Sequence, residues 1–272
     1  MNSQARLPIG IFDSGIGGLT VVRQLQKVLP NEDIIYLGDT ARVPYGSKSP
    51  ETVIRFARED TRFLVDQKVK AVVVACNTAS AWALSALERD FRIPVFGVIL
   101  PGARVALQKT KNKIIGVIAT SATVRSQAYT RAILARDDEV RIYARACPLL
   151  VPLVEEGWLN HAVTLKVLEE YLEPLRRRRI DTLVLGCTHY PLLKTALRKV
   201  VGKNVALVDS ADSCARFVRE RLEFLGLINL ERRRLGHIEP FVTDETEKFT
   251  ELAEKFLGHR IAPAVKIELP IL

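Results

Sequence analysis

Short apolar runs alternate with longer amphipathic stretches along most of the chain. Runs such as Leu7–Phe12 and Ala71–Cys76 are rich in apolar residues and contain no charged ones, which is typical of strands buried on both faces of a sheet. Helical periodicity marks segments such as Pro50–Gln67, where Ser49 supplies an N-cap and proline takes the first helical position. This alternation predicts an α/β protein built on parallel sheets.

The order of these elements occurs twice. Segments of the second half repeat segments of the first at a nearly constant offset, and the pairs are Pro8–Phe12 with Lys113–Ile118, Ile34–Tyr36 with Arg141–Tyr143, Val43–Pro44 with Val151–Pro152, Val72–Thr78 with Thr182–Thr188, and Val95–Val98 with Val205–Val208. Matches in one order indicate an internal duplication. We therefore expect two similar parallel-sheet α/β domains related by pseudo-two-fold symmetry, with the active site in the cleft between them.

A tail follows the second copy. It contains a helical stretch at Ala211–Leu225, a strand at Glu239–Val242, a helix at Asp244–Leu257 and a weakly alternating edge strand at Val265–Leu269. Because the tail holds no third copy of the repeat, we expect it to complete one of the two sheets. The predicted domains are residues 1–98 together with 211–272, and residues 99–210.

Composition is that of a globular protein. The chain has 272 residues, of which 48% are hydrophobic, enough for a sizeable core. No apolar run approaches the roughly 18 residues that a membrane helix needs, and Met1–Pro8 lacks the apolar region of a signal peptide. We expect a cytoplasmic protein with no membrane partner.

The net charge of +9 favours anionic ligands and permits binding to nucleic acid. The densest basic runs are Arg176–Arg179 and Arg232–Arg234, and no aromatic residues interleave with them, as a stacking platform for nucleic acid would require. Nucleic acid is therefore not expected as the main partner. Binding of nucleic acid or of a partner protein remains open as a second activity.

Four cysteines stand far apart in the chain. None forms a Cys-x-x-Cys pair, so neither a metal site nor a disulfide framework is predicted. Cys147 and Cys214 are interpreted as small buried side chains. Cys76 and Cys187 differ, because each ends the third strand of its copy beside a helix start, where ligands bind in open α/β sheets.

Three interpretations of the matched cysteines remain open. Both can be core residues, one can be a nucleophile with His189 as its base, or both can exchange protons with opposite faces of one substrate. Only the third explains the symmetry, because a single nucleophile needs no duplicate. A thiolate would remove a proton from carbon and a thiol on the other face would return one, so that the centre inverts. Thiols ionise near neutral pH, and more readily at helix N-termini.

Polar residues that follow strand ends and begin helices suit a small anionic substrate. Ser14, Asn77, Thr78 and Thr188 take such positions, where side-chain and backbone donors can hold a carboxylate. The glycines of Gly15–Gly18 allow a ligand to approach the backbone. Their spacing does not match the dinucleotide motif Gly-x-Gly-x-x-Gly, and no Gly-x-x-x-x-Gly-Lys motif is present. We therefore expect no nucleotide.

Three further ionisable residues are candidates for the proton chemistry. Asp13 and His189 flank the two cysteines and can relay protons or set the pKa of the neighbouring thiol. Asp13 can instead act only as a cap, and His189 can be purely structural. Glu155 lies in the second copy's equivalent of the loop around Tyr45 and is either a further catalytic group or a solvent-facing carboxylate.

Several motifs together resemble those of the glutamate racemases, cofactor-independent enzymes that supply D-glutamate for peptidoglycan. The resemblance extends from about Ile9 to about Leu257 and rests on FDSGIGGLTV at 12–21, YLGDTARVPYG at 36–46, ACNTASA at 75–81, ATSATVRSQAY at 119–129, CPLLVPLVEEG at 147–157 and GCTHYPLL at 186–193. Aspartate and hydantoin racemases share the two cysteines but generally lack this combination. An aspartate racemase is the alternative within the superfamily.

The resemblance implies a reaction and a set of site residues. It implies that Cys76 deprotonates D-glutamate, that Cys187 deprotonates L-glutamate, and that no cofactor takes part. Contacts with the substrate are implied for Asp13, Ser14, Pro44, Tyr45, Gly46, Asn77, Thr78, Thr188 and His189. The resemblance also implies a bacterial enzyme that is often a homodimer. Some relatives carry a long N-terminal extension linked to activation by a wall precursor; so few residues precede the first predicted strand that we expect no such activation.

Overall fold

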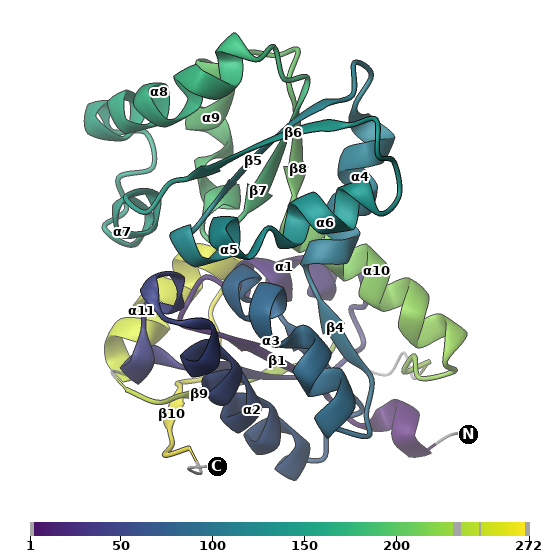
Figure 1. Cartoon of the computed structure of the whole chain (residues 1–272). Coiled ribbons are helices and arrows are strands. Elements are labelled where there is room, and N and C mark those ends of the chain that lie inside the picture. Colours follow the sequence, from purple (N-terminus) through teal and green to yellow (C-terminus); the bar gives the residue numbers. More distant parts are fainter. Residues whose placement is uncertain (1–2, 231–234, 245, 270–272) are drawn as a thin grey trace.

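A computed structural model describes residues 3–230, 235–244 and 246–269 as two stacked α/β halves (Figure 1). The first half forms the lower layer of the view and holds both ends of the described chain, while the second half lies above it. The basic run Arg232–Arg234 lies outside the described residues. Within them, no helix is both long enough and apolar enough to cross a bilayer.

The first sheet is parallel throughout and has the strand order β10-β9-β2-β1-β3-β4. The strands are β1 (Ile9–Asp13), β2 (Ile34–Gly38), β3 (Ala71–Val74), β4 (Val95–Gly97), β9 (Ile238–Val242) and β10 (Val265–Lys266). The two strands of the tail extend this sheet beyond β2. The division into domains at residues 98 and 211 remains a prediction.

The second sheet repeats the first. Its strands are β5 (Ile114–Ala119), β6 (Arg141–Ala146), β7 (Thr182–Gly186) and β8 (Ala206–Asp209), and they run parallel in the order β6-β5-β7-β8. This order is that of β2-β1-β3-β4 in the first half. The internal duplication predicted from the sequence is therefore confirmed by the topology.

Alternating side chains of the first sheet pack on helices at both faces, because successive residues of a strand point to opposite sides. Ile9 and Ile11 pack with the cluster that contains residues of α1 (Leu19–Val28), α10 (Ser210–Phe224) and α11 (Thr246–Leu257). Phe12 packs on the other face with α2 (Pro50–Asp66) and α3 (Asn77–Asp90). The predicted cap of α2 is confirmed, since the Ser49 hydroxyl accepts a hydrogen bond from the backbone N–H of Thr52.

The second sheet is covered in the same way. Leu183 and Leu185 pack with α8 (Ala162–Arg177) and α9 (Lys194–Val201) on one face, while Val117 and Val184 pack with α4 (Ile99–Lys109) and α6 (Ala128–Leu134) on the other. Short helices complete the described fold: α5 (Ser121–Ser126), α7 (Leu150–Glu155) and the 3-10 turns η1 (Ser3–Arg6), η2 (Thr40–Arg42), η3 (Tyr45–Ser47) and η4 (Tyr190–Leu193).

Several boundaries differ from the sequence prediction by one or two residues. The strand predicted at Val95–Ile99 ends at Gly97, because Val98 already caps α4. The helix predicted from Asp244 begins at Thr246. Cys147 and Cys214 are fully buried, which confirms their interpretation as small core side chains.

Candidate active site

Both sheets reverse their strand order at one point, and ligands of open α/β sheets bind at such points beside the carboxyl ends of the strands. In the first sheet this point lies between β1 and β3, and in the second between β5 and β7. Cys76 closely follows β3, and Cys187 directly follows β7. Asp13 ends β1, and Thr120 follows β5. The duplication therefore brings both cysteines to equivalent strand ends.

One pocket joins the two sets of strand ends. It has a volume of about 420 Å³ and is lined by both cysteines together with Ser14, Gly15, Val43, Pro44, Tyr45, Gly46, Ser47, Asn77, Thr78, Thr120, Ser121, Pro148, Val151, Pro152, Glu155, Thr188 and His189. The residues predicted for the site all line it apart from Asp13, which is fully buried. A larger groove of about 730 Å³ between α8 and α9 involves neither cysteine, so the chemistry belongs to the smaller pocket.

Cys76 is the N-cap of α3 and is only 5% exposed. Its sulfur accepts a hydrogen bond from the backbone N–H of Ala79 over 3.5 Å and lies 3.7 Å from Ser14 Oγ. Burial, together with the charge of Asp13, raises the pKa of this thiol to about 12, although the Ala79 and Ser14 contacts act in the opposite direction. Burial thus outweighs the helix N-terminus that the sequence singles out, and Cys76 is a neutral thiol at pH 7.

Cys187 has a different environment. Its sulfur lies 3.9 Å from His189 Nδ1, and His189 Nε2 lies 3.0 Å from Glu155 Oε1. Burial opposes a charge on His189, but hydrogen bonds and charge interactions with Cys187 and Glu155 together outweigh it and raise the imidazole pKa to about 10. His189 is therefore a cation at pH 7, and a cation beside a sulfur stabilises negative charge on it.

Asp13 connects the surroundings of the two cysteines. Its Oδ2 accepts a hydrogen bond from the backbone N–H of Gly15 over 3.1 Å, and its Oδ1 accepts one from the Thr188 hydroxyl over 3.4 Å. Burial raises the pKa of Asp13, while His189 and the hydrogen-bond donors act against burial. Asp13 therefore does more than cap its own turn, because it also contacts the second half.

The Asn77 side chain forms hydrogen bonds with Tyr129 and Ser210. Its Oδ1 accepts a hydrogen bond from the Tyr129 hydroxyl over 2.7 Å, and its Nδ2 donates to Ser210 Oγ over 3.5 Å. Tyr129 and Asn77 are both buried. These contacts fix the orientation of an amide that lines the pocket.

Thr78 belongs to a triangle of hydroxyl groups that spans the two halves. Its Oγ1 lies 2.9 Å from Thr120 Oγ1 and 3.1 Å from Thr123 Oγ1, and the last two oxygens are 2.9 Å apart. Neither Thr120 nor Thr123 was predicted from the sequence as a site residue. The available signal was the repeat, because Thr120 and Ser121 stand where Asp13 and Ser14 stand in the first copy.

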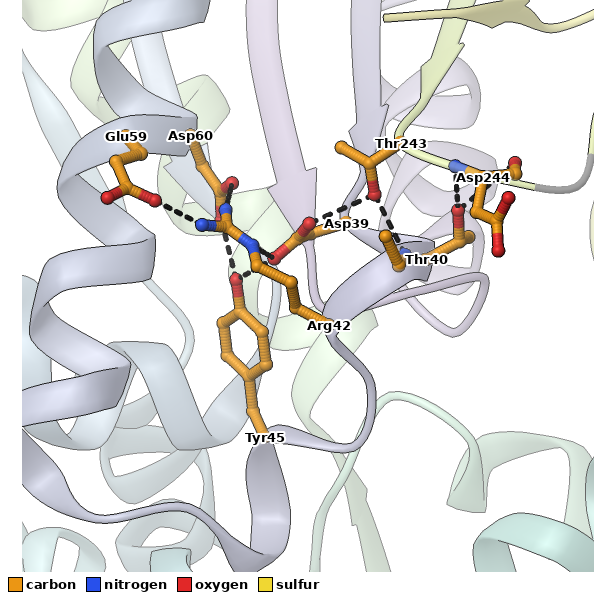
Figure 2. Close-up of polar contacts among 9 residues, drawn as sticks. Asp39, Thr40, Arg42, Tyr45, Glu59, Asp60, Thr243 and Asp244 are labelled. Carbon is orange, nitrogen blue, oxygen red and sulfur yellow. Dashed lines mark hydrogen bonds and ion pairs between the residues drawn. The ribbon is translucent and has the colours of Figure 1, made fainter. Parts of the chain in front are cut away.

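The loop Val43–Ser47 forms one wall of the pocket. Its Val43–Pro44 peptide is cis. Tyr45 is 1% exposed, and Figure 2 shows its hydroxyl directed toward Asp39 and Asp60, with oxygen–oxygen distances of 2.5 Å and 3.0 Å. The hydroxyl is therefore engaged in the protein interior, and the ring and backbone of Tyr45 remain for contact with a ligand.

An apolar wall faces this loop from the second half. Pro148, Val151 and Pro152 line the pocket at the start of α7. These residues were not predicted as part of the site, although Val151–Pro152 matches Val43–Pro44 in the repeat. Two matched loops thus enclose the cysteines and limit the access of water.

Metal ligation is not indicated in the described part of the chain. There, no group of three or more histidine, cysteine, aspartate or glutamate side chains is arranged to hold a metal ion. The pocket instead offers two thiols, a cationic imidazole and many hydroxyl, amide and backbone donors. Such a set can bind carboxylates and move a proton at carbon.

Comparisons with known proteins agree with this chemistry. The family model described as Asp/Glu/Hydantoin racemase matches residues 18–218. A glutamate racemase from Geobacter metallireducens is 50% identical over 261 residues, which cover 96% of this chain and 96% of the relative.

Solved structures give the same result. A glutamate racemase isoform from Bacillus anthracis superposes with a TM-score of 0.94 at 39% identity and covers 98% of this chain and 100% of its own. A glutamate racemase from Francisella tularensis, solved in complex with D-glutamate, has a TM-score of 0.90 at 38% identity and covers 97% and 98%. These likenesses span nearly the whole chain, including both cysteine-bearing halves.

Proposed function

The chain belongs to the Asp/Glu/Hydantoin racemase family and, within it, to the glutamate racemases, and from this premise we propose that Cys76 and Cys187 interconvert L- and D-glutamate without a cofactor. The observation that carries the proposal is the position of the two cysteines, at equivalent strand ends of duplicated halves and on one pocket. Two acid–base groups on opposite sides of a carbon atom invert it, whereas retention requires only one.

The electrostatics support a defined resting state. Cys76 is the protonated partner, because burial and Asp13 raise its pKa to about 12. Cys187 is assigned the role of the base for L-glutamate, because the His189 cation lies 3.9 Å from its sulfur and would stabilise negative charge there during the reaction. A racemase of this type needs one thiolate and one thiol at the same time, and the unlike neighbours of the two cysteines supply that difference.

The proposed step balances one proton on each face. The Cys187 thiolate takes the α-proton of L-glutamate and becomes a thiol, and the electron pair remains on the α-carbon and its carboxylate. The Cys76 thiol then gives its proton to the opposite face and becomes a thiolate. D-Glutamate leaves, and the enzyme has the inverse protonation state, which is ready for D-glutamate or returns through exchange with solvent.

The main energetic cost of this step is the negative charge that develops on the α-carbon when its proton is removed. Amino-acid α-protons are normally removed with an electron sink such as pyridoxal. Here, fixed donors in a largely dehydrated pocket would stabilise the developing charge. Ser14, Asn77, Thr78 and Thr188 carry such donors on the pocket wall, and the backbone N–H groups of Tyr45 and Gly46 would serve the second carboxylate.

The reaction in D₂O tests this proposal. Starting from L-glutamate without added cofactor, early D-glutamate should carry deuterium at the α-carbon while unreacted L-glutamate retains protium. The variants Cys76→Ser and Cys187→Ser should each lose nearly all racemisation. A single-base enzyme would instead wash deuterium into both enantiomers alike, and full activity in either variant would exclude two bases.

The proposed cellular role follows from the product. D-Glutamate would supply peptidoglycan synthesis in the cytoplasm, and we propose a homodimer as the working form. Growth of a D-glutamate-requiring bacterium on expression of this chain tests the role, and sedimentation analysis tests the dimer. No growth with an active, expressed enzyme would refute the cellular role alone.

A further inference from the structure

A polar cluster supports the Val43–Ser47 wall from the side away from the pocket. Figure 2 shows Arg42 among three carboxyl groups: its Nε lies 2.6 Å from Asp39 Oδ2, one terminal nitrogen lies 3.0 Å from Asp60 Oδ1, and the other contacts Glu59. All three carboxyl groups are buried, and none of these four residues lines the pocket. The cluster therefore acts on a ligand only through the loop that it holds.

Asp39 accepts hydrogen bonds at both of its carboxyl oxygens. Its Oδ1 accepts from the Thr243 hydroxyl over 3.0 Å, and its Oδ2 accepts from Arg42 and from the Tyr45 hydroxyl. Each oxygen is thus occupied by donors from other residues. Asp39 is therefore the acceptor for the Tyr45 hydroxyl.

The contact between Tyr45 and Asp60 then requires a proton from Asp60. A tyrosine hydroxyl has a single hydrogen, and the shorter contact, 2.5 Å to Asp39, takes it. The remaining 3.0 Å contact joins the tyrosine oxygen to Asp60 Oδ2. If Asp60 were ionised, two oxygen lone pairs would face each other in a buried site.

We propose, on the basis of the function above, that Arg42 and a neutral Asp60 are positioning residues that fix Tyr45 and thereby the substrate-facing wall Val43–Ser47. Full burial and the Asp39 charge raise the pKa of Asp60 well above its usual range, in agreement with the hydrogen-bond geometry. The groups that face Asp60 are Asp39, Arg42 and Tyr45 of the loop and Glu59 of its own helix.

The other side of the loop is tied to the tail. The backbone N–H of Ala41 donates to Thr243 Oγ1 over 2.8 Å, and that of Asp244 donates to Thr40 Oγ1 over 2.8 Å (Figure 2). The wall is thus held between α2 and the end of β9. Release from α2 would leave the loop free before binding, and ordering it would then oppose substrate association. The cysteines lie on other elements, so the rate of proton transfer should change less than the affinity for substrate.

Steady-state kinetics with both enantiomers test this assignment. Arg42→Met and Tyr45→Phe should each raise KM about tenfold while kcat falls less than about threefold, and calorimetry should show weaker binding of D-glutamate by the same factor. Arg58→Met is the matched control, because Arg58 lies on α2, the helix that carries Asp60, in an exposed ion pair with Asp90; its KM should match that of the unmodified protein. Equal KM in Arg42→Met and the unmodified protein, or a fall in kcat alone, would overturn the proposal.

The proton on Asp60 has its own test. Asp60→Leu should raise KM about tenfold, whereas Asp60→Asn keeps a donor for Tyr45 and an acceptor for Arg42 and should restore KM to within about twofold. Asp39→Asn, in contrast, should not keep KM close to that of the unmodified protein. The infrared band of a protonated carboxyl group should be lost from Asp60→Asn at neutral pH. Equal damage in both asparagine variants, with no change in that band, would show that Asp60 is ionised. An inactive unmodified protein would instead refute the racemase proposal.

Discussion

The Thr188 hydroxyl donates a hydrogen bond to Asp13 Oδ1 over 3.4 Å and so joins the strand ends of the two halves. Through this contact a single buried carboxyl group is linked to the residue that follows Cys187, and its charge also raises the pKa of Cys76. The two cysteines are matched in topology but not in electrostatics. That asymmetry would give the two cysteines unlike roles in the proposed two-base reaction.

Replacement of Asp13 tests its effect on Cys76. Asp13→Asn removes a negative charge from the neighbourhood of a buried thiol, so the pKa of Cys76 should fall from about 12 by roughly one unit. The measurement is the ultraviolet absorbance of the thiolate during a pH titration, with Asp13→Asn/Cys76→Ser as the blank. We expect kcat/KM to fall about 10²-fold. An unchanged titration of Cys76 would contradict this coupling.

Glu155 should control the alkaline limit of activity. The pKa of His189 is raised to about 10, so its cation persists at neutral pH and is lost as the pH rises through that value. Glu155→Gln removes one cause of the increase, and the alkaline limb of kcat/KM should therefore move to lower pH by about one unit or less, because Glu155 is partly solvated.

The pH profile of Glu155→Gln has two internal checks. The equilibrium constant of a racemisation is unity, so the limb must move equally for L- and D-glutamate. Glu156→Gln alters an exposed neighbour and should leave the profile unchanged. A shift toward higher pH in Glu155→Gln would mean that Glu155 does not stabilise the imidazolium ion.

The close approach of the two halves at Gly17 gives a prediction about geometry. A Cβ at this position would lie 2.3 Å from Thr188 Oγ1 and 2.5 Å from the His189 ring, so Gly17→Ala must displace both. Misplacement of catalytic groups by about 1 Å can cost about 10²-fold in rate, and we expect such a loss in kcat/KM. The added strain should lower the free energy of unfolding by about 1–3 kcal/mol.

Gly202→Ala separates the two effects of this substitution. Gly202 has a φ of 82° at the end of α9 and no atom near its Cβ position, so alanine there is strained without touching the pocket. It should lower stability by about 1–3 kcal/mol and leave kcat/KM unchanged. If Gly17→Ala retains full activity at a similar loss of stability, the contact with Thr188 and His189 does not position the site.

The duplication explains why so much of the site was predictable from the sequence. Cys76 and Cys187 end matched apolar runs, and parallel strands place such ends at one edge of a sheet, so their approach to one pocket follows from local patterns. The residues Asn77, Thr78, Thr188 and His189 closely follow the two cysteines in the sequence, and Ser14 follows the adjacent strand end at Asp13.

Residues that act across the halves were not predictable in the same way. The contacts of Thr120 and Thr123 with Thr78 depend on how the two halves pack, which no local pattern encodes. The turn of the Tyr45 hydroxyl away from the pocket depends on Asp39 and Asp60, two carboxyl groups brought together by a loop and a distant helix. Burial also raises the pKa of Cys76 more than the helix N-terminus lowers it. The burial of a side chain depends on tertiary packing, which local sequence patterns do not encode.

The pocket should discriminate strongly between substrates of different side-chain length. In the proposed reaction the α-carbon lies between Cys76 and Cys187, so donors that bind the far carboxylate of glutamate would remain unpaired when aspartate, one methylene shorter, is bound. Buried donors without partners discriminate strongly between substrates. We expect kcat/KM for L-glutamate to exceed that for L-aspartate by at least about 10²-fold under the same conditions. A ratio below about ten would favour an aspartate racemase or a broad-specificity enzyme, and would mean that the pocket recognises the amino-acid head group rather than the side-chain carboxylate.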